Sequence, residues 1–193
     1  MNLYIALGSA PAKTINEAAL VPEVRGALTR WLTNQPKADR GVLIGGLALS
    51  FYARPRQTMD VDLLFADRVP EVNSMFKKHR EHSAIDKKDH VEMEFVTPKT
   101  INIPHQVAAR VIDTAWEIGE LRIASLDSMI VLKLYGADNK RRQRQDEADI
   151  QSMLEHNRVH ITGLIESWHL SDLHAERLRQ IAIDVYGKED ALR

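Results

Sequence analysis

Residues 42–65, VLIGGLALSFYARPRQTMDVDLLF, decide the fold that the sequence predicts. The segment begins with a short apolar run that ends in a pair of glycines, and it closes on a second apolar run that contains Asp60 and Asp62. The mostly apolar residues 47–53 between them are suited to a short helix. We therefore predict a strand, a glycine turn, a helix and a second strand, in that order.

Asp60 and Asp62 are the chemically informative part of the second strand. Residues two apart in a strand point to the same face, about 7 Å apart along the chain. The two carboxylates therefore lie side by side, while Val61 and Leu63 face the core. Adjacent acids in an apolar strand repel each other and lose hydration unless a cation neutralises them. Their oxygen ligands favour Mg²⁺, so the pair predicts a metal site, with a solvated outer face as the alternative.

The stretch resembles the nucleotidyltransferases of the DNA polymerase β-like superfamily, and within it the bacterial AbiEii-type toxins and related proteins. The shared pattern is a Gly-Gly turn, a strand with Asp-x-Asp and residues between them: Gly45, Gly46, Ala48, Tyr52, Arg56, Thr58, Asp60 and Asp62. The resemblance covers about residues 40–155. It implies an α/β (α+β) nucleotidyltransferase fold, a short mixed sheet flanked by helices, with a C-terminal helical subdomain.

Residues 90–96, HVEMEFV, alternate between polar and apolar and predict another strand, with Glu92 and Glu94 on one face. In the superfamily a third carboxylate on a neighbouring strand completes the site. The resemblance of Glu94 and the residues after it to the family's ending of this strand favours Glu94. Glu92 stays an alternative because it shares the same face, and both could instead belong to a solvated surface.

Gly45, Gly46 and Arg56 are the candidate nucleotide-binding residues of the central stretch. Without side chains, the two glycines let backbone N–H groups approach a triphosphate beside the positive end of the following helix. Arg56 matches the family pattern, and its planar guanidinium suits bidentate contact with phosphate. The alternatives are a simple tight turn for the glycines and an ion pair with Asp60 or Asp62 for Arg56.

A second point of resemblance lies near the C-terminus. A predicted helix over 126–135 carries Lys133, and a basic run over 140–144 leads to Asp146. If a helix begins near Gln143, most of the basic residues precede it and lie outside its first turn, where the helix dipole disfavours positive charge. The resemblance implies that Lys133 binds phosphate and that Asp146 orients the nucleotide or the acceptor. Alternatively, Lys133 is a surface lysine, Asp146 caps a helix or pairs with an arginine, and the basic run is either an RNA contact or solvated surface.

Apolar spacing predicts further elements to which no chemistry is assigned. They are a helix from Pro22 that ends at 34–36, a crossover helix over 69–80, a polar turn over 86–89, a helix over 106–114, an edge strand over 121–124, and helices around 161–168 and 178–185. Residues 1–15 are an edge strand or a tail packed on the domain.

Length and composition limit the domain organisation, the partners and the location of the protein. The 193 residues suit a single compact unit, with a nucleotidyltransferase core over 1–124 and a helical region over 125–193 packed on it. The 26 Lys and Arg residues against 27 Asp and Glu give a net charge of −1, so any nucleic-acid contact must be a local patch. The absence of cysteine excludes disulfides and thiolate-bound zinc. Without a signal-like start or a long apolar run, we expect no membrane partner and a cytoplasmic location, if the source is bacterial.

The resemblance implies a metal-dependent enzyme. Asp60, Asp62 and Glu94 would bind two Mg²⁺ ions, or Mn²⁺, while an NMP passes from an NTP to a hydroxyl of tRNA, a protein or a small molecule. A toxin role with an antitoxin partner is also implied. The alternatives are a catalytically silent relative that binds nucleotide or a partner, and a structural domain with surface acids. The complete acid set favours the enzyme.

Overall fold

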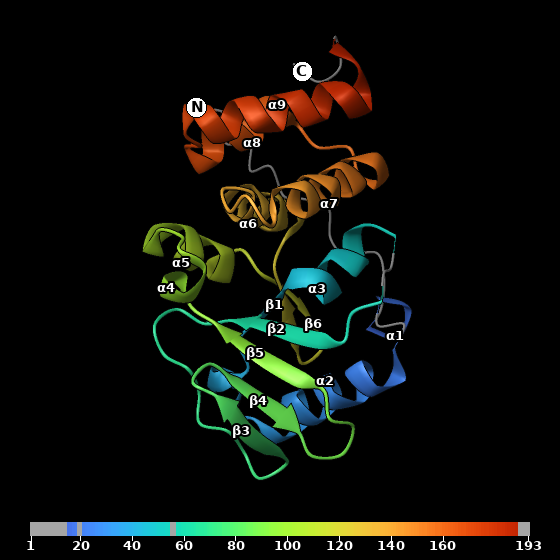
Figure 1. Ribbon diagram of the computed structural model, residues 1–193, viewed down its shortest axis with the longest axis vertical. Helices are drawn as coiled ribbons and strands as arrows, with labels where there is room; N and C mark the ends of the chain where they lie inside the picture. The colour runs from blue at the N-terminus through green and yellow to red at the C-terminus, as the bar shows by residue number, and fades with distance from the viewer. Residues whose placement is uncertain (1–14, 19–20, 55–56, 189–193) are drawn as a thin grey trace. The chain divides into compact units, whose positions relative to one another are not determined.

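The computed structural model describes residues 15–18, 21–54 and 57–188 of the chain. The chain divides into two compact units, one within Pro11–Ser125 and the other within Leu126–Arg193 (Figure 1). Arg56 and residues 1–14 lie outside the described residues. The phosphate contact of Arg56 and the strand or tail at the N-terminus therefore stay predictions.

The first unit is built on a mixed β-sheet flanked by helices, which confirms the predicted α/β class (Figure 1). Within the described residues the sheet has seven strands in the order β3-β4-β5-β2-β1-β7-β6. Their bounds are β1 Val42–Ile44, β2 Asp60–Leu64, β3 Phe76–Arg80, β4 Ser83–Asp86, β5 Glu92–Val96, β6 Trp116–Ile118 and β7 Leu121–Ile123. Strand β2 runs parallel to β5 and antiparallel to β1.

The helices of this unit are α1 Ile15–Ala18, α2 Pro22–Asn34, α3 Gly45–Tyr52, α4 Pro98–Ile101 and α5 His105–Asp113, with a 3₁₀ turn η1 at Lys37–Asp39. The predicted helix from Pro22 is confirmed, and its apolar stripe is buried. Trp31 of α2 packs on Phe95 with ring centroids 5.1 Å apart, on the face of the sheet that carries the aromatic core. Helix α3 covers the opposite face, because its first residue lies against Asp62.

The second unit is helical, as predicted for the C-terminal region. It consists of α6 Leu126–Gly136, α7 Gln143–His156, α8 Ile161–Trp168 and α9 Asp172–Tyr186. Helix α7 begins at Gln143, which confirms the start inferred from the order of charges. Leu134, Ile150, Leu178 and Ala182 are fully buried in this unit. None of the helices in the described part of the chain has the length and apolar character needed to cross a membrane.

Two elements predicted from the sequence are wrong. The residues expected to form a helix over 69–80 are an irregular connection followed by β3. Gln35 holds this connection, because its side-chain amide donates to the Glu71 carbonyl at 2.8 Å and accepts from Asn73 at 2.9 Å. Phe76 then packs on Trp31 of α2. This packing favours a strand here over the helix that the weak apolar spacing predicted. The strand predicted at the edge, β7, instead lies between β1 and β6.

Candidate functional site

Four carboxylates share one face of two neighbouring parallel strands. The register of β2 and β5 pairs Asp60 with Glu92 and Asp62 with Glu94. Residues paired in this way point to the same side of the sheet, about 4.8 Å apart between the strands. We call this group, Asp60, Asp62, Glu92 and Glu94, the carboxylate face.

The exposure of the four side chains differs. Asp60 and Glu94 are exposed, whereas Asp62 and Glu92 are partly buried. The hydroxyl of Thr58, a residue of the shared pattern, donates to Asp60 Oδ1 at 2.7 Å and so orients the first acid. Because Glu94 lies beside Asp62 and Glu92 lies beside Asp60, each candidate for the third acid has one aspartate as its neighbour.

Gly45 is the point where helix α3 meets the carboxylate face. Its φ of +68° is in the left-handed region, and a Cβ at this position would overlap the carboxylate of Asp62 and lie 2.6 Å from its Cγ. Only glycine meets both requirements without strain. The close approach brings the Asp62 carboxylate to the first turn of α3, where the helix dipole favours a negative charge. Gly46 follows it in the same turn and is buried.

The acids on this face are oxygen donors that suit a hard divalent cation. Within residues 15–18, 21–54 and 57–188, no three or more His, Cys, Asp or Glu side chains are grouped in a way that could hold a metal ion. The metal site formed by Asp60, Asp62 and Glu94 stays a prediction.

The helical unit contains a second charged cluster, in which Lys133 of α6 is paired with two aspartates of α7. Its ammonium nitrogen lies 2.8 Å from Asp146 Oδ1 and 2.6 Å from Asp149 Oδ2. The Lys133 side chain is only 8% exposed, so the alternative of a surface lysine is wrong. Arg142 also approaches Asp146, with its Nε 3.4 Å from Oδ2. Asp149 had no predicted role, although its position three residues after Asp146 places both on one face of a helix.

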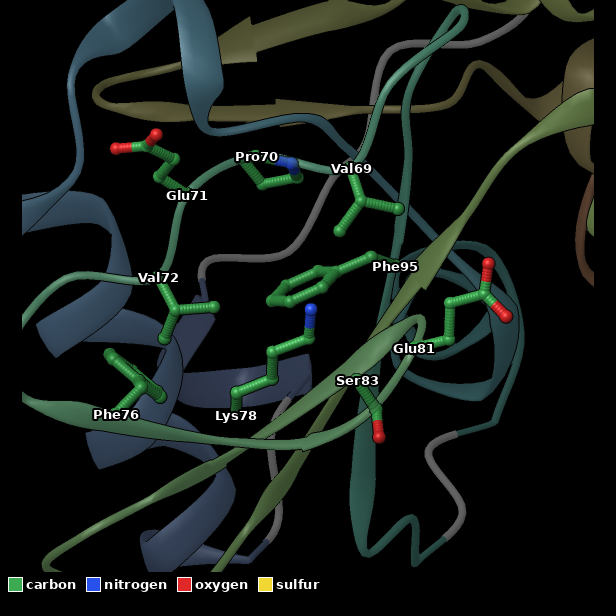
Figure 2. Close-up of a pocket in the computed structure, with 9 residues that line it drawn as sticks. All are labelled: Val69, Pro70, Glu71, Val72, Phe76, Lys78, Glu81, Ser83 and Phe95. Atoms are coloured by element: carbon green, nitrogen blue, oxygen red, sulfur yellow. The ribbon is translucent and has the colours of Figure 1, made fainter.

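A hollow of about 520 Å³ lies in the first unit between β3, β4, β5 and the segment that follows β2 (Figure 2). Val69, Val72, Phe76 and Phe95 give it an apolar lining, and Lys78 extends toward the Phe95 ring in Figure 2. None of the predicted site residues lines this hollow. It is therefore distinct from the carboxylate face.

The comparisons with known proteins give no assignment. The sequence matches no protein-family model, and no curated protein matches it.

Proposed function

We propose that this chain is a metal-dependent nucleotidyltransferase that moves an NMP from an NTP to an acceptor hydroxyl. The observation that supports the proposal is the register of β2 and β5, which pairs Asp62 with Glu94. The sequence distance between these acids is large, so the pairing comes from the fold and not from local composition. Gly45 supports the same proposal, because its missing side chain lets the N-terminus of α3 meet the Asp62 carboxylate.

The metal that we propose for the carboxylate face is Mg²⁺, with Mn²⁺ as a substitute, because carboxylate oxygens suit such hard cations. Asp60, Asp62 and Glu94 would hold one or two ions through their carboxylate oxygens. When bound, such ions neutralise charge on the triphosphate and its leaving group. The repulsion among the carboxylates of this face is the physical reason for expecting a cation there.

The remaining roles belong to the chain's own residues. Glu94 is exposed, so an acceptor hydroxyl can approach its carboxylate, which would take the proton of the hydroxyl as a general base. The backbone N–H groups of Gly45 and Gly46 at the start of α3 would bind phosphate oxygens of the NTP. Fixed donors of this kind stabilise the negative charge that develops on the leaving pyrophosphate.

The proposal does not depend on Lys133 and Asp146. Lys133 already binds two carboxylates, so a phosphate contact would have to replace one of them. The acceptor class, a toxin role with an antitoxin, and the cytoplasmic location stay predictions from the resemblance and the composition.

A transfer assay tests the proposal directly. The protein is incubated with NTPs labelled at the α-phosphate, Mg²⁺, and either total tRNA or cell lysate, and labelled products are separated. We expect transfer that requires the metal and that Asp62→Asn abolishes, because this change removes a ligand oxygen but keeps the shape. Glu94→Gln should lower the rate by about 100-fold or more, the scale of a lost general base.

Two matched variants complete the assay. Asp67→Asn changes an exposed aspartate of the same unit, outside the strands, and should leave transfer unchanged. Glu92→Gln should cost far less than Glu94→Gln, and the opposite ranking would identify Glu92 as the third acid. Full activity in Asp62→Asn would refute the proposed metal site.

A further inference from the structure

The edge of the sheet farthest from β6 carries a concentration of positive charge. Strand β3 is the terminal strand, and its last four residues are Lys77, Lys78, His79 and Arg80, all exposed. Lys87 and Lys88 follow β4, and the backbone N–H of Lys87 donates to the Met75 carbonyl at 3.1 Å. This bond places the second group of lysines beside the start of β3. We call the segment from 76 to 90 the basic hairpin (Figure 1).

The positive charge of the basic hairpin is not neutralised locally. Within the described residues, Lys77, Lys78, Arg80 and Lys88 form no ion pair with an acid. The hairpin's own Asp86 and Asp89 are both bound by Arg30 of α2. Its remaining acid, Glu81, has its carboxylate 3.6 Å from His82. A chain with a net charge of −1 therefore presents a local positive surface at this edge.

The surface is hollowed and not flat. A depression of about 280 Å³ opens on the hairpin, and its lining includes three lysines and two histidines: Lys77, Lys78, Lys87, His79 and His90. Lysine side chains bind phosphate oxygens, and imidazole rings can stack on unpaired bases. A membrane surface or an acidic peptide could pair with the lysines, but neither offers the imidazoles a base to stack on.

We propose that the basic hairpin binds single-stranded nucleic acid, with the lysines on its phosphates and His79 against a base. Binding of this kind is electrostatic and falls with added salt.

The hairpin is connected to the carboxylate face by strand register. Lys77 pairs with Ile85, Ile85 with Glu92, and Glu92 with Asp60, so these residues form one row on one face of four strands. With about 4.8 Å between strands, Lys77 lies about 14 Å from Asp60 across the sheet. A strand held at the hairpin could therefore extend to the carboxylates. This last step depends on the proposed function, whereas binding at the hairpin does not.

Fluorescence anisotropy with a labelled, unstructured RNA of about 12 nucleotides tests the proposal, a length within the usual range for single-strand sites. EDTA is present and NTP is absent, so the result is independent of any transfer chemistry. At about 0.1 M salt each phosphate contact contributes roughly fivefold in affinity to a single strand, with a salt slope of about 0.7. We expect Lys77→Gln/Lys78→Gln to weaken binding roughly 25-fold and to flatten the slope by about 1.4.

Lys99→Gln/Lys188→Gln is the matched control, because it removes the same charge from two exposed lysines that lie outside both the hairpin and the basic run over 140–144. It should change affinity less than about twofold, and Lys77→Arg/Lys78→Arg should bind like the parent. His79→Ala should weaken RNA binding about fivefold or more by loss of stacking. Circular dichroism would confirm that each variant is folded.

Three outcomes would overturn the proposal. One is unchanged affinity and salt slope in Lys77→Gln/Lys78→Gln. Another is an equal loss in the Lys99→Gln/Lys188→Gln control, which would show a general effect of charge. The third is parent protein that binds inorganic polyphosphate, polyglutamate or anionic phospholipid vesicles as tightly as it binds RNA.

Discussion

At the scale of single residues, the contact between Gly45 and Asp62 is the feature most sensitive to change. A side chain at position 45 would meet a left-handed backbone and would lie 2.6 Å from Asp62 Cγ and 2.9 Å from its Cβ. These atoms are close to a strand backbone and have little freedom to move. Position 45 therefore tolerates glycine alone, whatever the chemistry of the site.

Gly45→Ala is accordingly expected to lower the free energy of unfolding by more than the cost of alanine in a left-handed backbone conformation. Alanine in the left-handed region costs about 1–2 kcal/mol, and the overlap with Asp62 should add about 1–3 kcal/mol. Gly119→Ala is the control, because Gly119 has a similar φ of +59° and open space around it. Urea unfolding of both variants measures the difference. Equal losses of unfolding free energy in Gly45→Ala and Gly119→Ala would show that Asp62 moves away from the new side chain at no cost.

At the scale of elements, buried ion pairs join segments in both units. Lys133 joins α6 to α7 through Asp146 and Asp149. In the sheet unit, Arg30 of α2 donates to both carboxylate oxygens of the fully buried Asp86 at the end of β4, at 2.8 Å and 2.6 Å. Removal of one partner from such a pair leaves an uncompensated buried charge.

The Arg30 pair makes stability depend on pH. Burial by itself raises the pKa of Asp86, but hydrogen bonds from Arg30 and backbone N–H groups, with the Arg30 charge, outweigh burial and hold this pKa below its usual value of 3.8. A lowered folded-state pKa contributes stability above the unfolded pKa, and this contribution is lost as pH falls through the folded value.

Arg30→Met is therefore expected to cost about 3–5 kcal/mol near neutral pH. Without Arg30, burial raises the pKa of Asp86, so the variant regains stability as pH falls through this raised pKa toward 3.8. Below 3.8 the parent loses the stability that its lowered pKa contributed, so the difference in unfolding free energy between parent and variant should narrow over both ranges. Urea unfolding across this range measures it. Arg68→Met, which removes an exposed arginine paired with Asp39, should cost less than about 1 kcal/mol at every pH. A constant gap between Arg30→Met and the parent would contradict the titration of Asp86.

At the scale of the whole molecule, each unit has an apolar core of its own. Trp31, Met93 and Phe95 are buried in the sheet unit, and Ile150 and Leu178 are buried in the helical unit. Local contacts therefore stabilise each unit separately, which is the condition for separate opening on the time scale of hydrogen exchange.

Hydrogen exchange should reveal these units. Met93→Ala should speed exchange in β2, β4 and β5 more than in the helical unit, and Leu178→Ala should speed it in α6, α7 and α9 more than in the sheet. Each truncation removes a fully buried side chain and should cost about 2–5 kcal/mol. If each variant accelerated exchange equally in both units, the chain would open as one cooperative body.

Local spacing in the sequence determined many of the elements. The apolar stripe after Pro22, the glycine pair before a helix, the alternation around Glu92 and Glu94, and the order of charges near Gln143 each depend on residues a few positions apart. Such patterns are set by the periods of helix and strand, and the structure has the corresponding elements at these places. Strand β3 of the β3–β4 hairpin has no such pattern, because Phe76 is the single buried residue of this strand.

The sequence by itself thus determined the α/β class, the carboxylates of one strand face and the helical character of the C-terminal part. Only the tertiary structure decided that Asp62 pairs with Glu94, that Lys133 is buried between Asp146 and Asp149, and that β3 carries its lysines at a sheet edge. The physical reason is that strand register and ion pairing join segments distant in the chain. Their free energy comes from packing and desolvation of the assembled fold, which local periodicity does not contain.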